Sequence, residues 1–194
     1  VAGLGPLAFA ALLVWVFHSW AWDSIWYHVP LTKLAVQEKA LGWVETHNVW
    51  LLGFPRGVEL VDAWNVLLPH HNLLDDAAQL PFAVLGALAL AALFRDLGAS
   101  RPVAAGAAAL WLLAPPVALQ IPTALVDVAC GALLIAGWRW MAAPRFGALE
   151  RGMAALALAL YVGSKFTGAL HALVLAPLFL ARWVHASRGE RRDG

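Results

Sequence analysis

Charge is what this sequence has least of, since only 13% of its 194 residues are charged and the formal net charge is +1. A nearly neutral chain has no bulk positive field, so the composition argues against nucleic acid as a partner. The composition also disfavours a soluble globular domain, because 62% of the residues are hydrophobic and the mean hydropathy is +0.72. These values are typical of an integral membrane protein.

Cysteine is nearly absent as well. The single Cys130 cannot form an internal disulfide, and its position within an apolar run predicts a small core residue. Two catalytic signatures are also missing, namely the glycine-rich loop that binds nucleotide phosphates and the Gly-x-Ser-x-Gly elbow. The sequence therefore does not support a soluble nucleotide-sugar site.

Long apolar runs are abundant, and most are close to the roughly 20 residues that a helix needs to cross a bilayer. They cover residues 4–20, 77–94, 102–119 and 124–140, and a longer region at 152–182 is divided by the segment 163–168. We expect this last region to form two short helices that meet at Lys165. The first run has no basic segment before it and no cleavage site after it, so we interpret it as a retained helix. The predicted fold is all-α, a polytopic transmembrane bundle of about six membrane helices.

Basic residues indicate how the chain is oriented. They gather at Arg95 and Arg101, at Arg139, Arg145 and Arg151, and at Arg182, Arg188, Arg191 and Arg192. With about six passes, all three groups fall on one side of the membrane, which the positive-inside rule assigns to the cytoplasm. We therefore expect a multi-pass protein of the bacterial inner membrane with both termini cytoplasmic. Residues 1–186 would form the membrane module, and residues 187–194 a disordered tail.

Residues 22–76 form the long outer loop of this prediction, and they are rich in tryptophan and net acidic. Two helices are expected in it, at 27–41 and 57–68. The second has a clear amphipathic pattern, with Leu60, Val61, Trp64, Leu67 and Leu68 on one face and Glu59, Asp62 and Asn65 on the other. Such helices lie flat in the membrane interface, with the apolar face toward lipid and the polar face solvated.

Three charged residues are the strongest candidates for chemistry. Asp23 is the first acid of the chain and follows an apolar run, where a carboxylate is costly to keep unless it is used. It could be a general base, or a helix cap or solvent-exposed acid. Lys165 lies between two apolar segments and could bind phosphate or extend to the interface. Asp127 could favour a helix dipole, pair with Lys165 or contact a substrate hydroxyl.

Weaker candidates lie in the outer loop. Arg56, in a Pro-Arg-Gly turn, could bind phosphate or be a solvated loop charge, and His28 and Glu59 could contact substrate. A divalent metal could be held by His28 with Asp23, or by His70 and His71 with Asp75 and Asp76, although no spacing here is a recognised ligand motif. His18 and His171 could ligate a tetrapyrrole, yet packing histidines are far commoner.

Five motifs, taken in order, resemble a known family. They are W-D-S-I-W-Y-H-V-P (22–30), F-P-R-G-V-E-L (54–60), F-R-D-L-G-A-S-R (94–101), A-P-P-V-A-L-Q-I-P-T-A-L-V-D (114–127) and V-G-S-K-F-T-G (162–168). The series resembles the membrane module of the GT-C glycosyltransferases, a superfamily that includes bacterial aminoarabinose transferases and protein mannosyltransferases. The resemblance covers nearly the whole chain.

The resemblance implies transfer of a sugar from a polyprenyl-phosphate donor at the outer membrane face. Asp23 matches the essential acid of the first outer loop, Asp127 resembles a second outer acid, and Lys165 resembles a lysine near the donor site. The chain departs from the family in having Ser24 after Asp23, where many members have a second acid. It also has about six expected helices, where full-length enzymes have more and often carry a soluble C-terminal domain.

These departures leave a second hypothesis open. A GT-C-derived chain without catalysis could be a structural subunit of a larger membrane complex, a pigment-associated complex among the options. The enzyme hypothesis requires a bound sugar lipid, whereas the structural hypothesis requires partner subunits. A transporter or channel is disfavoured, because few charged residues lie within the apolar runs and the sequence has no inverted repeat.

Overall fold

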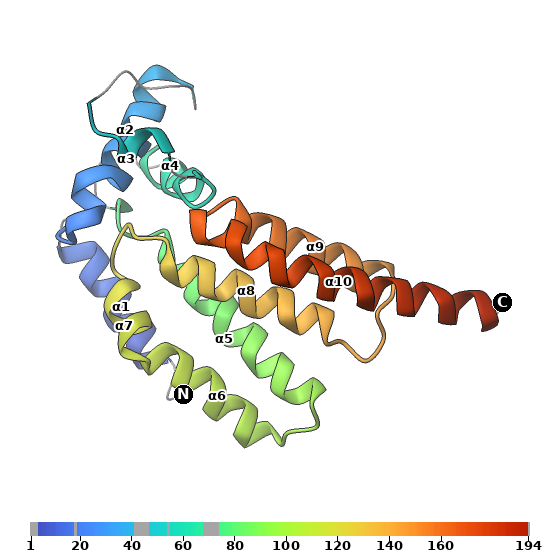
Figure 1. Ribbon diagram of the computed structural model, residues 1–194. Coiled ribbons are helices and arrows are strands. Elements are labelled where there is room, and N and C mark those ends of the chain that lie inside the picture. The colour runs from blue at the N-terminus through green and yellow to red at the C-terminus, as the bar shows by residue number, and fades with distance from the viewer. Residues whose placement is uncertain (1–3, 18, 41–46, 54, 68–73, 194) are drawn as a thin grey trace.

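The computed structural model describes residues 4–17, 19–40, 47–53, 55–67 and 74–193 (Figure 1). All regular structure in these ranges is helical, which confirms the all-α prediction. The main helices are α1 (Leu4–Val16), α5 (Gln79–Asp96), α6 (Arg101–Leu113), α8 (Asp127–Met141), α9 (Ala148–Val162) and α10 (Phe166–Asp193).

Helices α5, α8 and α9 form the packed centre, where α8 lies between the other two, and α6 covers α5 while α10 runs beside α9 (Figure 1). Small residues line these contacts, among them the fully buried Ala83, Ala129 and Ala154. Helices that present alanine and glycine can bring their backbones close together, which is how apolar helices associate without a hydrophobic driving force. This packing holds the ends of α5, α8 and α9 in fixed relative positions.

Two helices are long and apolar enough to cross a membrane, namely α5 and the Phe166–Ser187 part of α10. Two shorter apolar helices, Gly5–Val16 and Arg101–Leu113, fall below the length that a span requires. Only 11% of the candidate span in α10 is buried inside the structure, so most of its apolar side chains face outward. Length and composition therefore identify two candidate spans in the described part of the chain.

One of the predicted helices is divided in two. The run at 102–119 is two helices, because α6 ends at Leu113 and α7 (Pro115–Gln120) follows. The cause is local: the residue before a proline avoids the helical region, and Ala114 adopts φ −58° and ψ 124°. The predicted break near Lys165 is present, between Val162 and Phe166.

The region after this break is not a short helix followed by a disordered tail. Helix α10 contains 28 residues and continues through Asp193, so it includes nearly all of the segment 187–194 that was expected to be disordered. Alanine, arginine and glutamate are good helix formers, and no proline follows Pro177 to stop the helix. Helix propensity therefore outweighs the polarity on which the tail prediction depended.

The described part of residues 22–76, the predicted outer loop, forms four short helices over one end of the bundle (Figure 1). They are a π-helix, η1 (Ser24–His28), followed by α2 (Val29–Glu38), α3 (Trp50–Gly53) and α4 (Glu59–Leu67). Both helices that the sequence predicts in this loop are present, although the first begins as a π-helix and ends at Glu38, before Lys39 with its φ of 52°. Helix α4 packs against α2, and η1 continues directly into α2.

Helix α4 is turned the opposite way from the prediction. Glu59 and Asp62 on its polar face are only 5% and 2% exposed, whereas Leu60, Trp64 and Leu67 are 41%, 62% and 43% exposed. The expectation of a solvated polar face was therefore wrong. The reason is that α4 lies over a polar end of the bundle, where other acidic and basic side chains meet the polar face. Its apolar face is left for lipid or another apolar surface.

Candidate functional site

The candidate site lies where the outer segment meets the end of the bundle (Figure 1). Asp127 is the first residue of α8, and Lys165 lies in the turn between α9 and α10. Asp23 directly precedes η1, and Glu59 begins α4. Residues separated by more than a hundred positions are thus brought to one end of the molecule by four different elements.

Lys165 and Asp127 form an ion pair between Nζ and Oδ1. The pairing is one of the roles that the sequence analysis left open for Asp127. The two side chains remain 33% and 43% exposed, so water surrounds much of the pair. A half-exposed pair contributes about 0–1 kcal/mol to stability, and its lysine can turn toward an incoming anion at little cost. The negative charge of Asp127 at the first turn of α8 also favours that helix dipole.

Asp23 is exposed and occupies the position before η1, but its side chain makes no capping hydrogen bond there. The helix-cap alternative considered for this residue is therefore wrong. Its carboxylate instead hydrogen bonds with Tyr27, one helical turn further on. Asp23 is thus an accessible carboxylate with a neighbouring phenol.

Tyr27 links the acidic residues of three elements. Burial, followed by the nearby charges of Asp23, Asp127 and Glu59, raises the pKa of Tyr27 to about 12. The phenol therefore keeps its proton over the physiological range and can donate a hydrogen bond to an acid or to a substrate oxygen. Sequence reasoning missed Tyr27. The available signal was its spacing of four residues from Asp23, which places the two side chains on one helical face.

His28 and Glu59 do not face an open site. Both side chains are buried, and Nδ1–H of His28 donates to Oε1 of Glu59 over 2.7 Å. Neither side chain is accessible in this structure, and their contact with substrate stays a prediction. They instead connect η1 to α4, and the hydroxyl of Thr32 donates to the His28 carbonyl at 3.0 Å. Their role is to position the segment that carries Asp23 and Tyr27.

Arg56 is half-buried in the turn before α4, and its Nη2 donates to the Leu51 carbonyl at 3.2 Å. The next residue ties this turn to the bundle, since the Gly57 amide donates to the Gly163 carbonyl at 2.9 Å. Gly163 lies two residues before Lys165. Arg56 thus contacts a residue of its own loop, and the turn that contains Arg56 lies beside the turn that carries Lys165.

The described residues contain no group of three histidine, cysteine or acidic side chains that could hold a metal ion. Of the metal candidates, His70 and His71 lie outside the described residues, as does the tetrapyrrole candidate His18. The other tetrapyrrole candidate, His171, is hydrogen-bonded through Nδ1 to the Tyr161 hydroxyl and stacks on that ring. The contact joins α9 to α10 and is the packing role considered for a histidine here.

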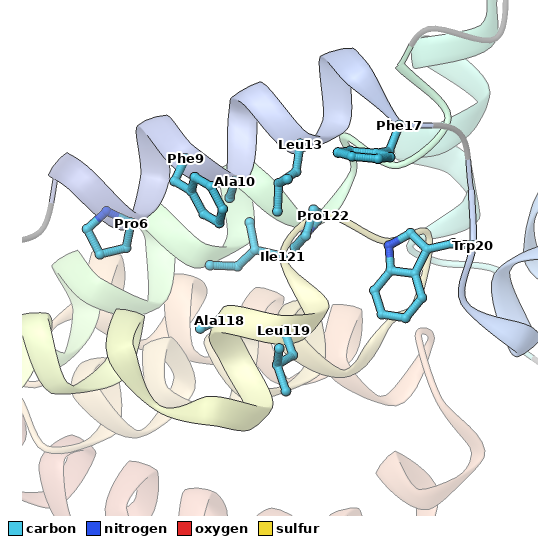
Figure 2. A pocket seen from close by; sticks show the side chains of 10 residues that line it. All are labelled: Pro6, Phe9, Ala10, Leu13, Phe17, Trp20, Ala118, Leu119, Ile121 and Pro122. Atoms are coloured by element: carbon cyan, nitrogen blue, oxygen red, sulfur yellow. The ribbon is translucent and has the colours of Figure 1, made fainter.

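An apolar cavity of about 470 Å³ runs between α1 and α7, and Figure 2 shows the side chains that line it. These are Pro6, Phe9, Ala10, Leu13, Phe17, Trp20, Ala118, Leu119, Ile121 and Pro122. None of them is charged, so the cavity suits a hydrocarbon chain. Trp20, at one end of the cavity in Figure 2, is only three residues before Asp23. The cavity thus leads toward the polar end of the bundle.

Comparison with protein-family models, with curated proteins and with solved structures finds no match for this chain.

Proposed function

We propose that this chain is a membrane glycosyltransferase module that uses a polyprenyl-phosphate-linked sugar at the extracytoplasmic face. The observation that carries the proposal is the juxtaposition of an accessible carboxylate, an exposed lysine–aspartate pair and an apolar cavity. Asp23 directly precedes η1, Lys165 and Asp127 pair at the same end of the bundle, and Trp20 lies at one end of the cavity. These are the parts that transfer from a lipid phosphate requires.

The proposed chemistry divides among these parts. Asp23 accepts the proton of the acceptor hydroxyl as that oxygen bonds to the anomeric carbon. The bond between the anomeric carbon and the phosphate oxygen breaks, and the leaving lipid phosphate keeps the electron pair. Lys165 moves from Asp127 toward the phosphate and offsets the developing charge. Tyr27, which holds its proton, orients the Asp23 carboxylate, and the cavity between α1 and α7 holds the lipid.

The proposal includes a bundle of about six membrane passes in the bacterial inner membrane. In support, the far end of the bundle collects basic residues. Arg139 pairs with Asp96 at 3.2 Å between α8 and α5, and Nη2 of Arg182 donates to the Ala143 carbonyl at 3.0 Å. The positive-inside rule would place this end in the cytoplasm and the end with Lys165 outside.

The direct test is Asp23→Asn in membranes supplied with a radiolabelled polyprenyl-phosphate sugar. Asparagine keeps the shape of the side chain but cannot accept the proton, so we expect transfer to fall by about 10²–10⁴-fold with normal expression. Glu38→Gln is the matched control, because Glu38 is an exposed acid at the end of α2. Equal transfer by the Asp23→Asn and Glu38→Gln proteins would remove Asp23 from the mechanism.

A second candidate function is a structural subunit derived from such an enzyme, in keeping with the hypothesis of a larger, pigment-associated or other membrane complex. Two observations favour it: only 11% of the candidate span in α10 is buried inside the structure, and the charge of Lys165 is already paired with Asp127. Purification in native lipid discriminates between the two functions. Stoichiometric partner subunits without a bound polyprenyl lipid would favour the structural role, whereas a recovered sugar lipid would favour the transferase.

A further inference from the structure

The carboxyl group of Asp62 is buried and has no bonding partner in the part of the chain that the structure describes. Its side chain is 2% exposed, and neither oxygen has a hydrogen-bond partner among the described residues. Glu59, one turn earlier on the same face of α4, is also buried and uses only Oε1, so its Oε2 is unpartnered in the same way. Two adjacent buried carboxyl groups with free oxygens cannot both carry a charge without a large loss of stability.

Charged groups from every neighbouring element face this pair. Asp75 and Asp76, just before α5, add two more acids, and both are buried. The positive groups already have other partners, since Lys33 of α2 pairs with Asp75 at 2.8 Å and His28 of η1 is bonded to Glu59. Ser19 donates to Oδ1 of Asp76 at 2.9 Å. Among the described residues, four carboxyl groups thus face the two basic side chains Lys33 and His28, whose ion pairs are with Asp75 and Glu59.

A metal ion does not resolve this imbalance, because no three of the described acidic, histidine or cysteine side chains are placed to hold one. A proton resolves the charge imbalance, because it turns one carboxylate into a neutral group with an O–H donor. Oε2 of Glu59 is an acceptor on the same face of α4. We propose that Asp62 carries a proton shared with Glu59, and that this proton holds α4 in place over the end of the bundle.

The direction of the Asp62 pKa agrees with this assignment. Burial, followed by the charges of Glu59, Asp76 and Asp75, raises the pKa of Asp62 well above its ordinary value. A group whose folded-state pKa is raised stabilises the fold fully below its unfolded pKa, and this stabilisation is lost as the pH rises through the folded value. The contact of α4 is therefore strongest at low pH and weakens toward alkaline pH.

The position of α4 gives this proton a consequence for the candidate site. Glu59 holds η1, which carries Tyr27, through the bond to His28. The start of α4 holds the turn before Lys165 through the bond from the Gly57 amide to the Gly163 carbonyl. Helix α4 thus connects the two halves of the site. Ionisation of Asp62 would place a second charge beside Glu59 and release α4 from both.

Infrared difference spectroscopy of the whole protein in lipid tests the protonation directly. A protonated buried carboxyl has a C=O stretch separate from that of a carboxylate. We expect this band at neutral pH, its loss at alkaline pH, and its absence from Asp62→Asn, which mimics the protonated form. Glu38→Gln, on the exposed end of α2, should keep the band. A neutral-pH band that survives Asp62→Asn, or no such band in the unsubstituted protein, would overturn the proposal.

Hydrogen exchange of the α4 amides tests the structural effect. In the unsubstituted protein we expect protection of α4 to fall at alkaline pH by more than the intrinsic rise in exchange, and Asp62→Asn should keep α4 protected. Identical pH dependence in the two proteins would overturn the proposed hold on α4. If Asp62→Asn does not fold, Glu59→Gln serves instead. Removing the negative charge of Glu59 lowers the pKa of Asp62, so the C=O band of protonated Asp62 must disappear at a lower pH. Neither experiment measures sugar transfer. The protonation of Asp62 is therefore tested independently of the proposed glycosyltransferase function.

Discussion

The ion pair between Lys165 and Asp127 contributes little to stability, whereas the proposed function gives Lys165 a role in binding the donor phosphate. Both side chains are partly exposed, and water screens a pair of this kind. A charged side chain between two apolar helices is costly to keep, so a lysine at this position is expected to have a function besides stabilising the fold. In the proposed function, Asp127 holds the Lys165 ammonium close to the site and releases it when the donor phosphate binds.

Lys165→Gln should therefore separate the two roles. We expect the free energy of unfolding to change by no more than about 1 kcal/mol, because the pair is half-exposed. Transfer from the polyprenyl-phosphate donor should fall by about 10²-fold or more, because the charge on the leaving phosphate is no longer offset. Denaturant unfolding in detergent and the radiolabelled transfer assay measure the two quantities.

Lys39→Gln is the control for this substitution, since Lys39 is an exposed lysine at the end of α2. Retained transfer in Lys165→Gln, together with several kcal/mol of lost stability, would contradict the phosphate role and leave a structural one.

At the scale of elements, a backbone hydrogen bond from the Gly57 amide to the Gly163 carbonyl joins the turn before α4 to the turn after α9. A Cβ added at Gly57 would lie 2.7 Å from the Gly163 carbonyl oxygen and 2.8 Å from the Ser164 hydroxyl. Ser164 cannot move easily, because its hydroxyl also donates to the Leu160 carbonyl at 2.6 Å. Glycine is thus required at position 57 by the closeness of its neighbours.

Gly57→Ala should push α4 away from the turn that carries Lys165. We expect a loss of about 1–3 kcal/mol in the free energy of unfolding, the usual cost of overpacking. Gly152→Ala in α9 is the matched control, since a Cβ there meets nothing within 4 Å and alanine is the better helix former by about 0.5–1 kcal/mol. Thermal unfolding of the two proteins side by side measures the difference, and equal stability would show that α4 does not depend on this contact.

The orientation of α4 explains why an amphipathic pattern alone was insufficient. The alternation of Leu60, Val61 and Trp64 with Glu59 and Asp62 correctly predicts a helix, which the structure has at Glu59–Leu67. It does not say which face is buried, because that depends on what lies beneath. Here the polar face meets the buried His28 of η1 and the buried acids Asp75 and Asp76 before α5, so Glu59 and Asp62 lie inside.

At the scale of the whole molecule, the two ends of the bundle differ in charge. One end carries Arg139 and Arg182, and the other carries Asp23, Asp127 and the buried acids. This separation is what a helical bundle across a bilayer would show.

Cysteine labelling tests that arrangement. In a Cys130→Ala background, a cysteine at His47 should react with a membrane-impermeant maleimide applied from outside the inner membrane. A cysteine at Ala142, in the turn after α8, should react only after the membrane is opened. Both replaced residues are exposed, whereas Cys130 is buried. Labelling of both cysteines from the same side would contradict a bundle that spans the membrane with its ends on opposite faces.

Local sequence determined the helices, the break at residues 163–165, the two helices of the outer loop, and the concentration of arginines in the turns of one end. These features depend on propensity, proline and glycine positions and composition, all of which act over a few residues. Only the tertiary structure decided that Lys165 pairs with Asp127, that Tyr27 lies among three acids, and that Asp62 is buried without a partner among the described residues. Each of these depends on side chains brought together from two or more elements, and no local pattern records which neighbours a side chain will meet.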